Sequence, residues 1–113
     1  KITRKQLLSN WSNELKNIIF LQGWTKKTLL KIGCERINFA FLDAQHTKED
    51  VLFEFNFVAN RQKKGDIIIF DDVSPGIFDS VCDAIKEIKN KNTYDVQEIS
   101  FSPNRGYAIA YKR

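Results

Sequence analysis

The sequence predicts an α/β fold, with three parallel strands, flanking helices and a C-terminal antiparallel β-hairpin. Two apolar runs, within Ile37–Leu42 and Ile67–Phe70, do not alternate with polar residues and are typical of parallel strands covered on both faces. Segments with apolar residues at helical spacing separate them. The 113 residues, 42% of them hydrophobic, suffice for one core, so we expect a single domain over residues 1–113.

The first third of the chain is expected to supply a helix, a strand and a short helix. Thr3–Lys16 carries apolar residues at helical spacing, and Ile18–Leu21 is a short apolar run that Gly23 ends. A short helix then covers Thr25–Ile32, because its first residue can cap it and Gly33 can terminate it.

The central part is expected to hold two parallel strands joined by a helix. Strand Ile37–Leu42 leads into a helix from Thr47 to about Arg61, where Thr47 and the acid three residues later form a variant of the capping box. A turn at Lys63–Asp66 then delivers the chain into strand Ile67–Phe70.

The last third is expected to form an amphipathic helix and a hairpin. Ser74 and Pro75 are a good helix entry, and an apolar stripe at helical spacing continues to Ile88. Strands Tyr94–Phe101 and Tyr107–Tyr111 flank a turn that contains Pro, Asn and Gly. The expected order is therefore α-β-α-β-α-β-α-β-β.

The composition argues against several classes of partner. Lys and Arg number 18 against 14 Asp and Glu, and because the basic residues are scattered, no nucleic-acid face is indicated. No apolar stretch approaches the roughly 20 residues of a membrane span, so no membrane partner is expected. Cys34 and Cys82 stand far apart without a CxxC pattern, which indicates neither a zinc site nor a disulfide and favours a cytoplasmic protein with reduced thiols.

Polar side chains follow the two central strands at the point where each strand ends. Asp43 and His46 come after the first, and Asp71 and Asp72 come after the second. Open α/β sheets place their sites beyond the carboxyl ends of parallel strands, so we expect these four residues to converge. Taken singly, each has a plainer explanation, since carboxylates also favour the start of a following helix.

The segments around these residues resemble a known family. The matching segments are Phe41–His46 with Glu49–Val51, then Lys64–Asp72, and a hairpin that closes on Arg105–Tyr107. Together they resemble the C-terminal half of class I S-adenosylmethionine (SAM)-dependent methyltransferases, of the macrocin type (methyltransferase family 24) and similar to catechol O-methyltransferase. The resemblance extends from about Ile18 to the last residue and implies a partial Rossmann-like methyltransferase sheet.

This resemblance implies transfer of the methyl group of SAM to a hydroxyl of a small molecule, with Mg²⁺ as an assisting ion. In such enzymes a strand-end acid and an acidic pair hold the metal, and the matching positions here are Asp43, Asp71 and Asp72. His46 stands where catechol-type relatives have a basic lysine. His46 and Asp43 are thus the expected catalytic residues, and the unperturbed pKa of a histidine suits a base.

The resemblance implies that part of the family's cofactor-binding site is lacking from this chain. Class I methyltransferases cradle SAM with a Gly-x-Gly loop, and the five glycines of this chain include no such pair. Gly23 and Trp24 are the expected cofactor-binding positions, as a wall for the adenine. We therefore expect a fragment that lacks the N-terminal cofactor-binding strands and the Gly-rich loop and is inactive in isolation.

Two other interpretations remain open. The phosphoacceptor receiver fold also ends a strand in aspartate, but its acidic pair precedes the acceptor, whereas Asp71 and Asp72 follow Asp43. A non-catalytic α/β interaction module, or a dimerising remnant of a methyltransferase, would keep the scaffold without the chemistry. Cofactor or metal binding would discriminate between these interpretations and the enzyme.

Without the family's first strands, Ile37–Leu42 would be left at the edge of the sheet. Unpaired backbone groups beside apolar side chains invite pairing with another chain. We therefore expect either that Ile18–Leu21 pairs directly with Ile37–Leu42, or that a homodimer forms through this edge.

Overall fold

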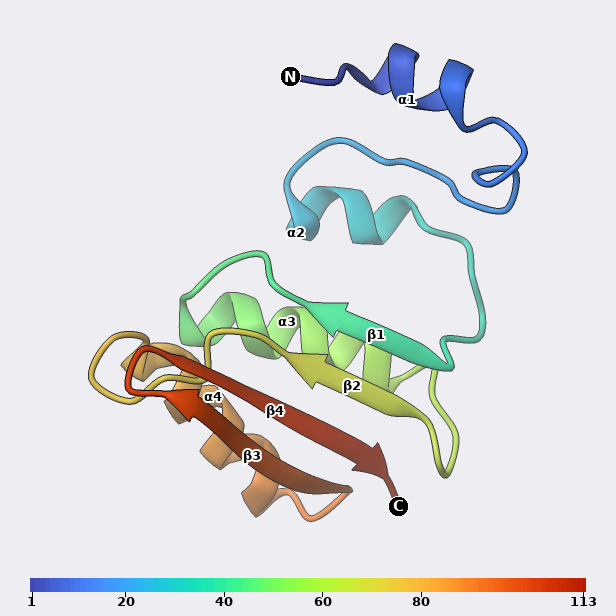
Figure 1. Cartoon of the computed structure of the whole chain (residues 1–113). Helices are drawn as coiled ribbons and strands as arrows, with labels where there is room; N and C mark the ends of the chain where they lie inside the picture. Colours follow the sequence, from blue (N-terminus) through green and yellow to red (C-terminus); the bar gives the residue numbers. More distant parts are fainter.

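The computed structural model describes all residues from 1 to 113 (Figure 1). Its helices are α1 (Arg4–Asn10), α2 (Thr25–Thr28) with the 3₁₀ turn η1 (Leu29–Lys31), α3 (Lys48–Ala59) and α4 (Asp79–Asn90). Its strands are β1 (Phe39–Leu42), β2 (Ile67–Phe70), β3 (Tyr94–Ser102) and β4 (Arg105–Lys112). No helix combines the length and the apolar character needed to cross a membrane.

The four strands form one mixed sheet in the order β1-β2-β4-β3. Only β1 and β2 run parallel, with Phe39 opposite Ile67 and Leu42 opposite Phe70. Strand β4 runs antiparallel to both of its neighbours, β2 and β3. The α/β class and the C-terminal hairpin are confirmed, whereas the expectation of three parallel strands is wrong, because the sheet contains two.

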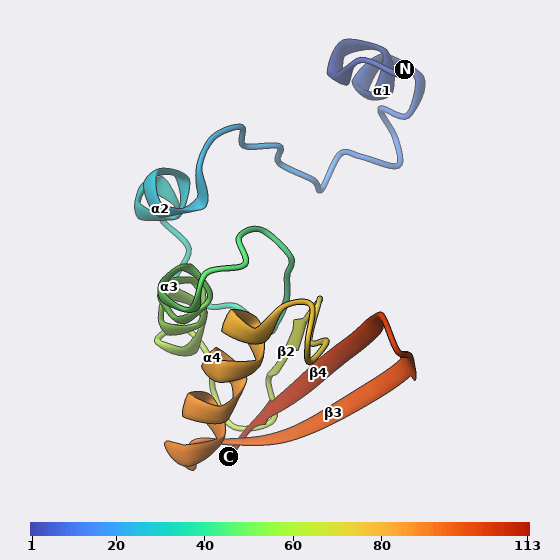
Figure 2. The ribbon, with the colours of Figure 1, turned by 90° about the vertical axis from the view of Figure 1, so that its left-hand side faces the viewer.

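The missing parallel strand is the predicted one at Ile18–Leu21, which is a loop between α1 and α2. Ile19 is 85% exposed, and the carbonyl of Phe20 accepts a hydrogen bond from the Arg4 guanidinium at 3.1 Å instead of joining a sheet. A short apolar run becomes a strand only where a neighbour satisfies its backbone groups, and here none lies alongside. The segment from α1 to α2 stands apart from the sheet (Figures 1 and 2).

Helices α3 and α4 pack against one face of the sheet and against each other (Figure 2). The core lies between them and that face, and its fully buried side chains come from every layer: Val51, Phe55, Val58, Ile68, Phe70, Val81, Ala84, Ile85, Ile88, Tyr94, Ala108 and Ala110. Thr47 caps α3 by accepting the N–H of Asp50 at 3.1 Å, as predicted. Helix α4 begins only at Asp79, because the chain from Ser74 to Phe78 forms a turn with Gly76 at φ +84°.

The opposite face of the sheet has no helix over it (Figure 2). Phe39 is 57% and Phe41 50% exposed there. Strand β1 has a single neighbour and is an open edge, since α2 packs against α3 rather than beside the strand. The expected closure by Ile18–Leu21 is therefore wrong, and closure by a second copy stays a prediction.

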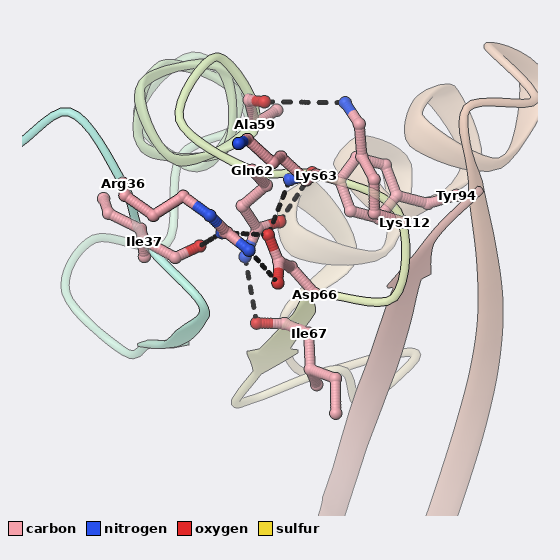
Figure 3. Close-up of polar contacts among 9 residues, drawn as sticks. All are labelled: Arg36, Ile37, Ala59, Gln62, Lys63, Asp66, Ile67, Tyr94 and Lys112. Carbon is pink, nitrogen blue, oxygen red and sulfur yellow. Dashed lines mark hydrogen bonds and ion pairs between the residues drawn. The ribbon is translucent and has the colours of Figure 1, made fainter.

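A group of polar side chains ties the structure together at the end of the sheet where β2 begins (Figure 3). We call this group the polar brace; it consists of Arg36, Gln62, Asp66 and Tyr94. Arg36 forms a bidentate ion pair with Asp66, which also accepts the N–H of Lys63 at 2.6 Å. The Tyr94 hydroxyl donates to Gln62 Oε1 at 2.6 Å. Every member of the brace therefore has a partner.

The electrostatics of the brace follow from these contacts. Hydrogen bonding to Arg36 holds the pKa of Asp66 below its usual range, although burial opposes the shift. Burial raises the pKa of Tyr94 to about 12, because its anion would lie in the core. At neutral pH Asp66 is therefore ionised and Tyr94 is protonated, so the ion pair with Arg36 and the hydrogen bond to Gln62 are both intact.

Candidate functional site

The parallel pair β1 and β2 delivers the predicted site residues to the other end of the sheet. Leu42 and Phe70 are opposite one another in the register, so the residues that follow them leave the sheet side by side. The N–H of Asp71 donates to the carbonyl of Leu42 at 3.0 Å, which extends the pairing one step beyond the strands. The turn after β1 then brings His46 back toward the end of β2.

Three side chains converge at this rim. The carboxylate oxygens of Asp43 and Asp72 and a ring nitrogen of His46 all lie within 4.8 Å of one another. We call these three residues the rim cluster. His46 Nε2 lies 2.7 Å from Asp72 Oδ2, and the imidazole ring sits 4.3 Å from the ring of Phe78. The ring is thus held in place on one side by an apolar contact and on the other by a carboxylate.

Of the acidic pair, Asp72 rather than Asp71 belongs to the cluster. Asp72 has φ 58°, in the left-handed region that residues other than glycine adopt infrequently and that is often found at functional sites. Asp71, by contrast, uses Oδ1 to accept the N–H of Asp72 at 2.8 Å. The structure therefore brings together Asp43, Asp72 and His46, while Asp71 lies beside them, bonded to the backbone N–H of Asp72 and in contact with the carboxyl group of Asp43.

The rim carries uncompensated negative charge. The pKa of Asp43 is raised, first by burial and then by the charges of Asp71 and Asp72, with a smaller opposing effect of His46. No lysine or arginine is paired with any of these three acids. A divalent cation would relieve this repulsion, and two carboxylates with one imidazole are donors that such an ion accepts in proteins.

The predicted cofactor residues lie close to this rim. Gly23 and Trp24 line a pocket of about 400 Å³ together with Ala44 and Gln45, which directly follow Asp43. This volume lies in the range of small-molecule sites. Gly23 has φ +146°, and an added Cβ would meet Thr28 Oγ1 at 2.7 Å, so a larger residue would disturb the turn that presents Trp24. The assignment of Gly23 and Trp24 to the cofactor stays a prediction.

Glu54 lies next to the rim cluster, and the sequence analysis did not single it out. It lies in α3, is 2% exposed, and its Oε1 has no hydrogen-bond partner. Burial raises its pKa. It lines a narrow pocket together with Asp43 and His46, and it also lines a pocket of about 340 Å³ beside the β1 edge. The available signal was an acid one position before Phe55, on the apolar face of the predicted helix.

Comparison with known proteins places this arrangement in a family. Residues 3–73 match methyltransferase family 24, described as "Methyltransferase domain", and this range covers more than half of the chain. The chain belongs to this methyltransferase family. The match begins at Thr3, upstream of the predicted start near Ile18, and ends just after the acidic pair. No curated protein sequence matches the chain.

Solved methyltransferases share the fold. The O-methyltransferase of Bacillus cereus in complex with SAH is 16% identical, with a TM-score of 0.73 over 100% of this chain and 60% of its own. The O-methyltransferase TomG of Streptomyces achromogenes, involved in tomaymycin synthesis and solved with SAM, is 14% identical, with a TM-score of 0.71 over 96% of this chain and 56% of its own. The methyltransferase chain described here thus spans a little over half the length of these proteins.

Proposed function

We propose that this methyltransferase chain carries the catalytic rim of a SAM-dependent enzyme that methylates a hydroxyl group of a small molecule in the cytoplasm. The observation that supports this most is the rim cluster, which lies directly beside the Gly23–Trp24 pocket. Ala44 and Gln45 line that pocket and connect it to Asp43 along the chain. A cofactor in the pocket would lie next to the acids.

In the proposed reaction, the chain binds and orients both partners. Trp24, which is largely exposed, offers an aromatic face to the adenine of SAM. Asp43 and Asp72, with Asp71 beside them, would hold a divalent cation, and when bound, such an ion lowers the pKa of the acceptor hydroxyl. The resemblance gives His46 the place of the base. Methyl transfer needs the hydroxyl oxygen held in line with the donor, which requires the remainder of the cofactor site.

Cofactor binding by the 113-residue chain tests this proposal. We expect titration with SAH to quench the fluorescence of Trp24, with weak affinity because the Gly-rich loop is lacking. Trp24→Phe should abolish the quenching. Trp11→Phe is the control and should leave the quenching unchanged, because Trp11 lies in the turn after α1 and does not line the pocket. Quenching that persists in Trp24→Phe would remove the support for this pocket.

Radiolabelled methyl transfer completes the test. A protein that joins this chain to the N-terminal strands and Gly-rich loop typical of the family should methylate small phenols or sugar hydroxyls, and Asp43→Asn should abolish the transfer. We expect the 113 residues alone to show none.

A non-catalytic role is the second candidate, because β1 is an open edge and the face that carries Phe39 and Phe41 is uncovered. Pairing of β1 with β1 of a second copy would close the edge and join the two sheets. Light scattering after size-exclusion chromatography would then give twice the mass of the chain, with no binding of SAH.

A further inference from the structure

The position of Trp24 is not fixed by its own surroundings. Its side chain is 70% exposed, so burial does not hold it in place. It caps α2, which is a single turn of four residues without a buried side chain. A helix this short is not stable alone in water, so contacts with another element must hold it. Where Trp24 lies therefore depends on what connects α2 to the rest of the chain.

Two polar contacts connect the start of α2 to α3, on which it packs (Figure 2). The ammonium group of Lys26 pairs with Asp50 at 2.6 Å. The hydroxyl of Thr25 forms a hydrogen bond with the carboxyl group of Glu54. Asp50 and Glu54 lie one turn apart on the same face of α3. Two acids on one helix face thus contact the two residues that directly follow Trp24.

The two contacts differ in how firmly they can hold α2. The side chain of Lys26 is 54% exposed, and an ion pair in contact with water contributes little. Glu54 is 2% exposed and Thr25 is partly buried, so their hydrogen bond is shielded from water and is stronger for it. The bond between Thr25 and Glu54 is therefore the contact that matters most for the position of Trp24.

The carboxyl group of Glu54 is unfavourable for the fold itself. Its Oε1 is buried without a partner, and an unpaired buried acceptor costs free energy that an apolar side chain of similar size would not cost. Stability alone therefore does not account for an acid at this position. Orientation of a pocket wall does account for it, because such walls are held by hydrogen bonds from the side chains behind them. Trp24 and Thr25 both line the pocket of about 400 Å³ beside the rim.

We propose that Glu54 is a positioning residue, which acts through the hydroxyl of Thr25 to fix Trp24 in the wall of the cofactor pocket. The contact of Trp24 with SAM rests on the proposed function. The effect of Glu54 on Trp24 does not, because the contacts that carry it lie within the chain and need no ligand.

The fluorescence anisotropy of Trp24 in the 113-residue chain tests this effect without ligand. Trp11→Phe supplies the background, because it leaves Trp24 as the single tryptophan. Glu54→Leu and Thr25→Val each remove one side of the hydrogen bond and should lower the anisotropy. Glu54→Gln and Thr25→Ser keep an acceptor and a donor, so both should retain the background value. Glu49→Leu is the matched control, since it removes an exposed acid of the same helix and should change nothing.

Two further measurements separate positioning from a general loss of structure. Glu54→Leu combined with Thr25→Val should lower the anisotropy no further than either change alone, because the two residues share one bond. The unfolding temperature of Glu54→Leu should equal or exceed that of the background, since the unpaired oxygen is removed as well. Titration with SAH should give an affinity about three- to tenfold weaker in Glu54→Leu, as expected for the loss of one hydrogen bond.

Unchanged anisotropy in Glu54→Leu and Thr25→Val, or additive losses in the double variant, would overturn the inference. A fall in the unfolding temperature of Glu54→Leu would also overturn it, because Glu54 would then stabilise the fold as a whole. A background chain that binds no SAH, yet loses anisotropy in the two variants as expected, would count against the proposed function alone.

Discussion

The two ends of the parallel strands β1 and β2 carry polar side chains of opposite character. At the end where β2 begins, the polar brace pairs every charge: Arg36 neutralises Asp66, and Tyr94 satisfies Gln62. At the other end, Asp43, Asp71 and Asp72 face one another without a basic partner other than a single imidazole. The same pair of strands thus has one end that stabilises the fold and one end that stores electrostatic repulsion.

The difference in pairing between the two ends separates polar groups that stabilise the fold from groups available to a ligand. Polar groups that stabilise the fold are fully paired, because leaving a buried polar group without a partner costs more free energy than a hydrogen bond contributes on balance. Groups that bind a ligand must leave charges or hydrogen-bonding atoms unpaired for it, so they tend to destabilise the folded chain when the ligand is absent. Substitutions at the two ends are therefore expected to change stability in opposite directions.

The largest effect is expected for Tyr94→Phe at the brace. The substitution leaves Gln62 Oε1 buried without its donor, which costs about 1–3 kcal/mol of unfolding free energy. Urea denaturation measures this loss. Tyr111→Phe on the uncovered face is the control and should stay within about 0.5 kcal/mol of the wild type. Equal effects of the two substitutions would show that the Tyr94 bond does not stabilise the fold.

The same variant should alter the response to alkaline pH. The pKa of Tyr94 is raised to about 12 in the folded chain, against about 10 when unfolded. The folded state therefore retains this proton more tightly, and stability falls as the pH rises from about 10 toward 12. Tyr94→Phe should show less of this fall than Tyr111→Phe does.

A smaller effect is expected for Arg36→Gln. Arg36 lowers the pKa of Asp66, so the stability that the pair contributes is present above the unfolded pKa of about 3.9 and is lost as the pH falls through the folded value. The variant should be less stable than the wild type at pH 7, and the difference should shrink below pH about 4. Denaturation curves across this range measure it. A difference that grows toward acid pH would contradict the prediction.

Substitution of Asp43 at the rim should increase stability, whereas the substitutions at the brace decrease it. The raised pKa of Asp43 means that its ionised form is disfavoured in the folded chain, so Asp43→Asn should raise the unfolding temperature slightly at pH 7. This gain should vanish below pH about 4, where the carboxyl is protonated in the wild type as well. Thermal unfolding at the two pH values measures it. A lower unfolding temperature at pH 7 would mean that Asp43 serves the fold.

The smallest change in stability is expected for Phe41→Lys on the uncovered face. Phe41 is half exposed, so the substitution should stay within about 0.5 kcal/mol of the wild type. A charge beside an open strand edge discourages pairing with another chain, so any self-association should decrease. Light scattering over a concentration series measures the mass. A monomeric wild type would remove the proposed homodimer.

The sequence was sufficient to predict the parts of the fold that depend on local pattern. The strands β1 and β2, the helices α3 and α4 and the hairpin lie close to their predicted positions. Ile18–Leu21 has an equally apolar pattern but is a loop, because a strand also needs a neighbour for its backbone groups, and sequence pattern does not report on neighbours.

The sequence was likewise sufficient to predict only part of the candidate site. Strand ends placed Asp43, His46 and Asp72 together, as expected. Which acid of the pair Asp71 and Asp72 joins the cluster depends on the local backbone conformation, which the pair Asp-Asp does not reveal. Glu54 was missed because an acid inside an apolar stripe is usually taken as an interruption of the pattern, whereas here it is a buried carboxyl group whose Oε1 has no partner.

The strand order β1-β2-β4-β3 has a consequence for synthesis of the chain on the ribosome. Strand β4 is made after all the others, yet it lies in the interior of the sheet, between β2 and β3. Until Lys112 has been added, β2 has a partner on one side only, and the core lacks Ala108 and Ala110. At roughly 5–20 residues per second, the β1–β2 pair waits seconds with both of its edges open, so the nascent chain has more need of a chaperone than the finished one.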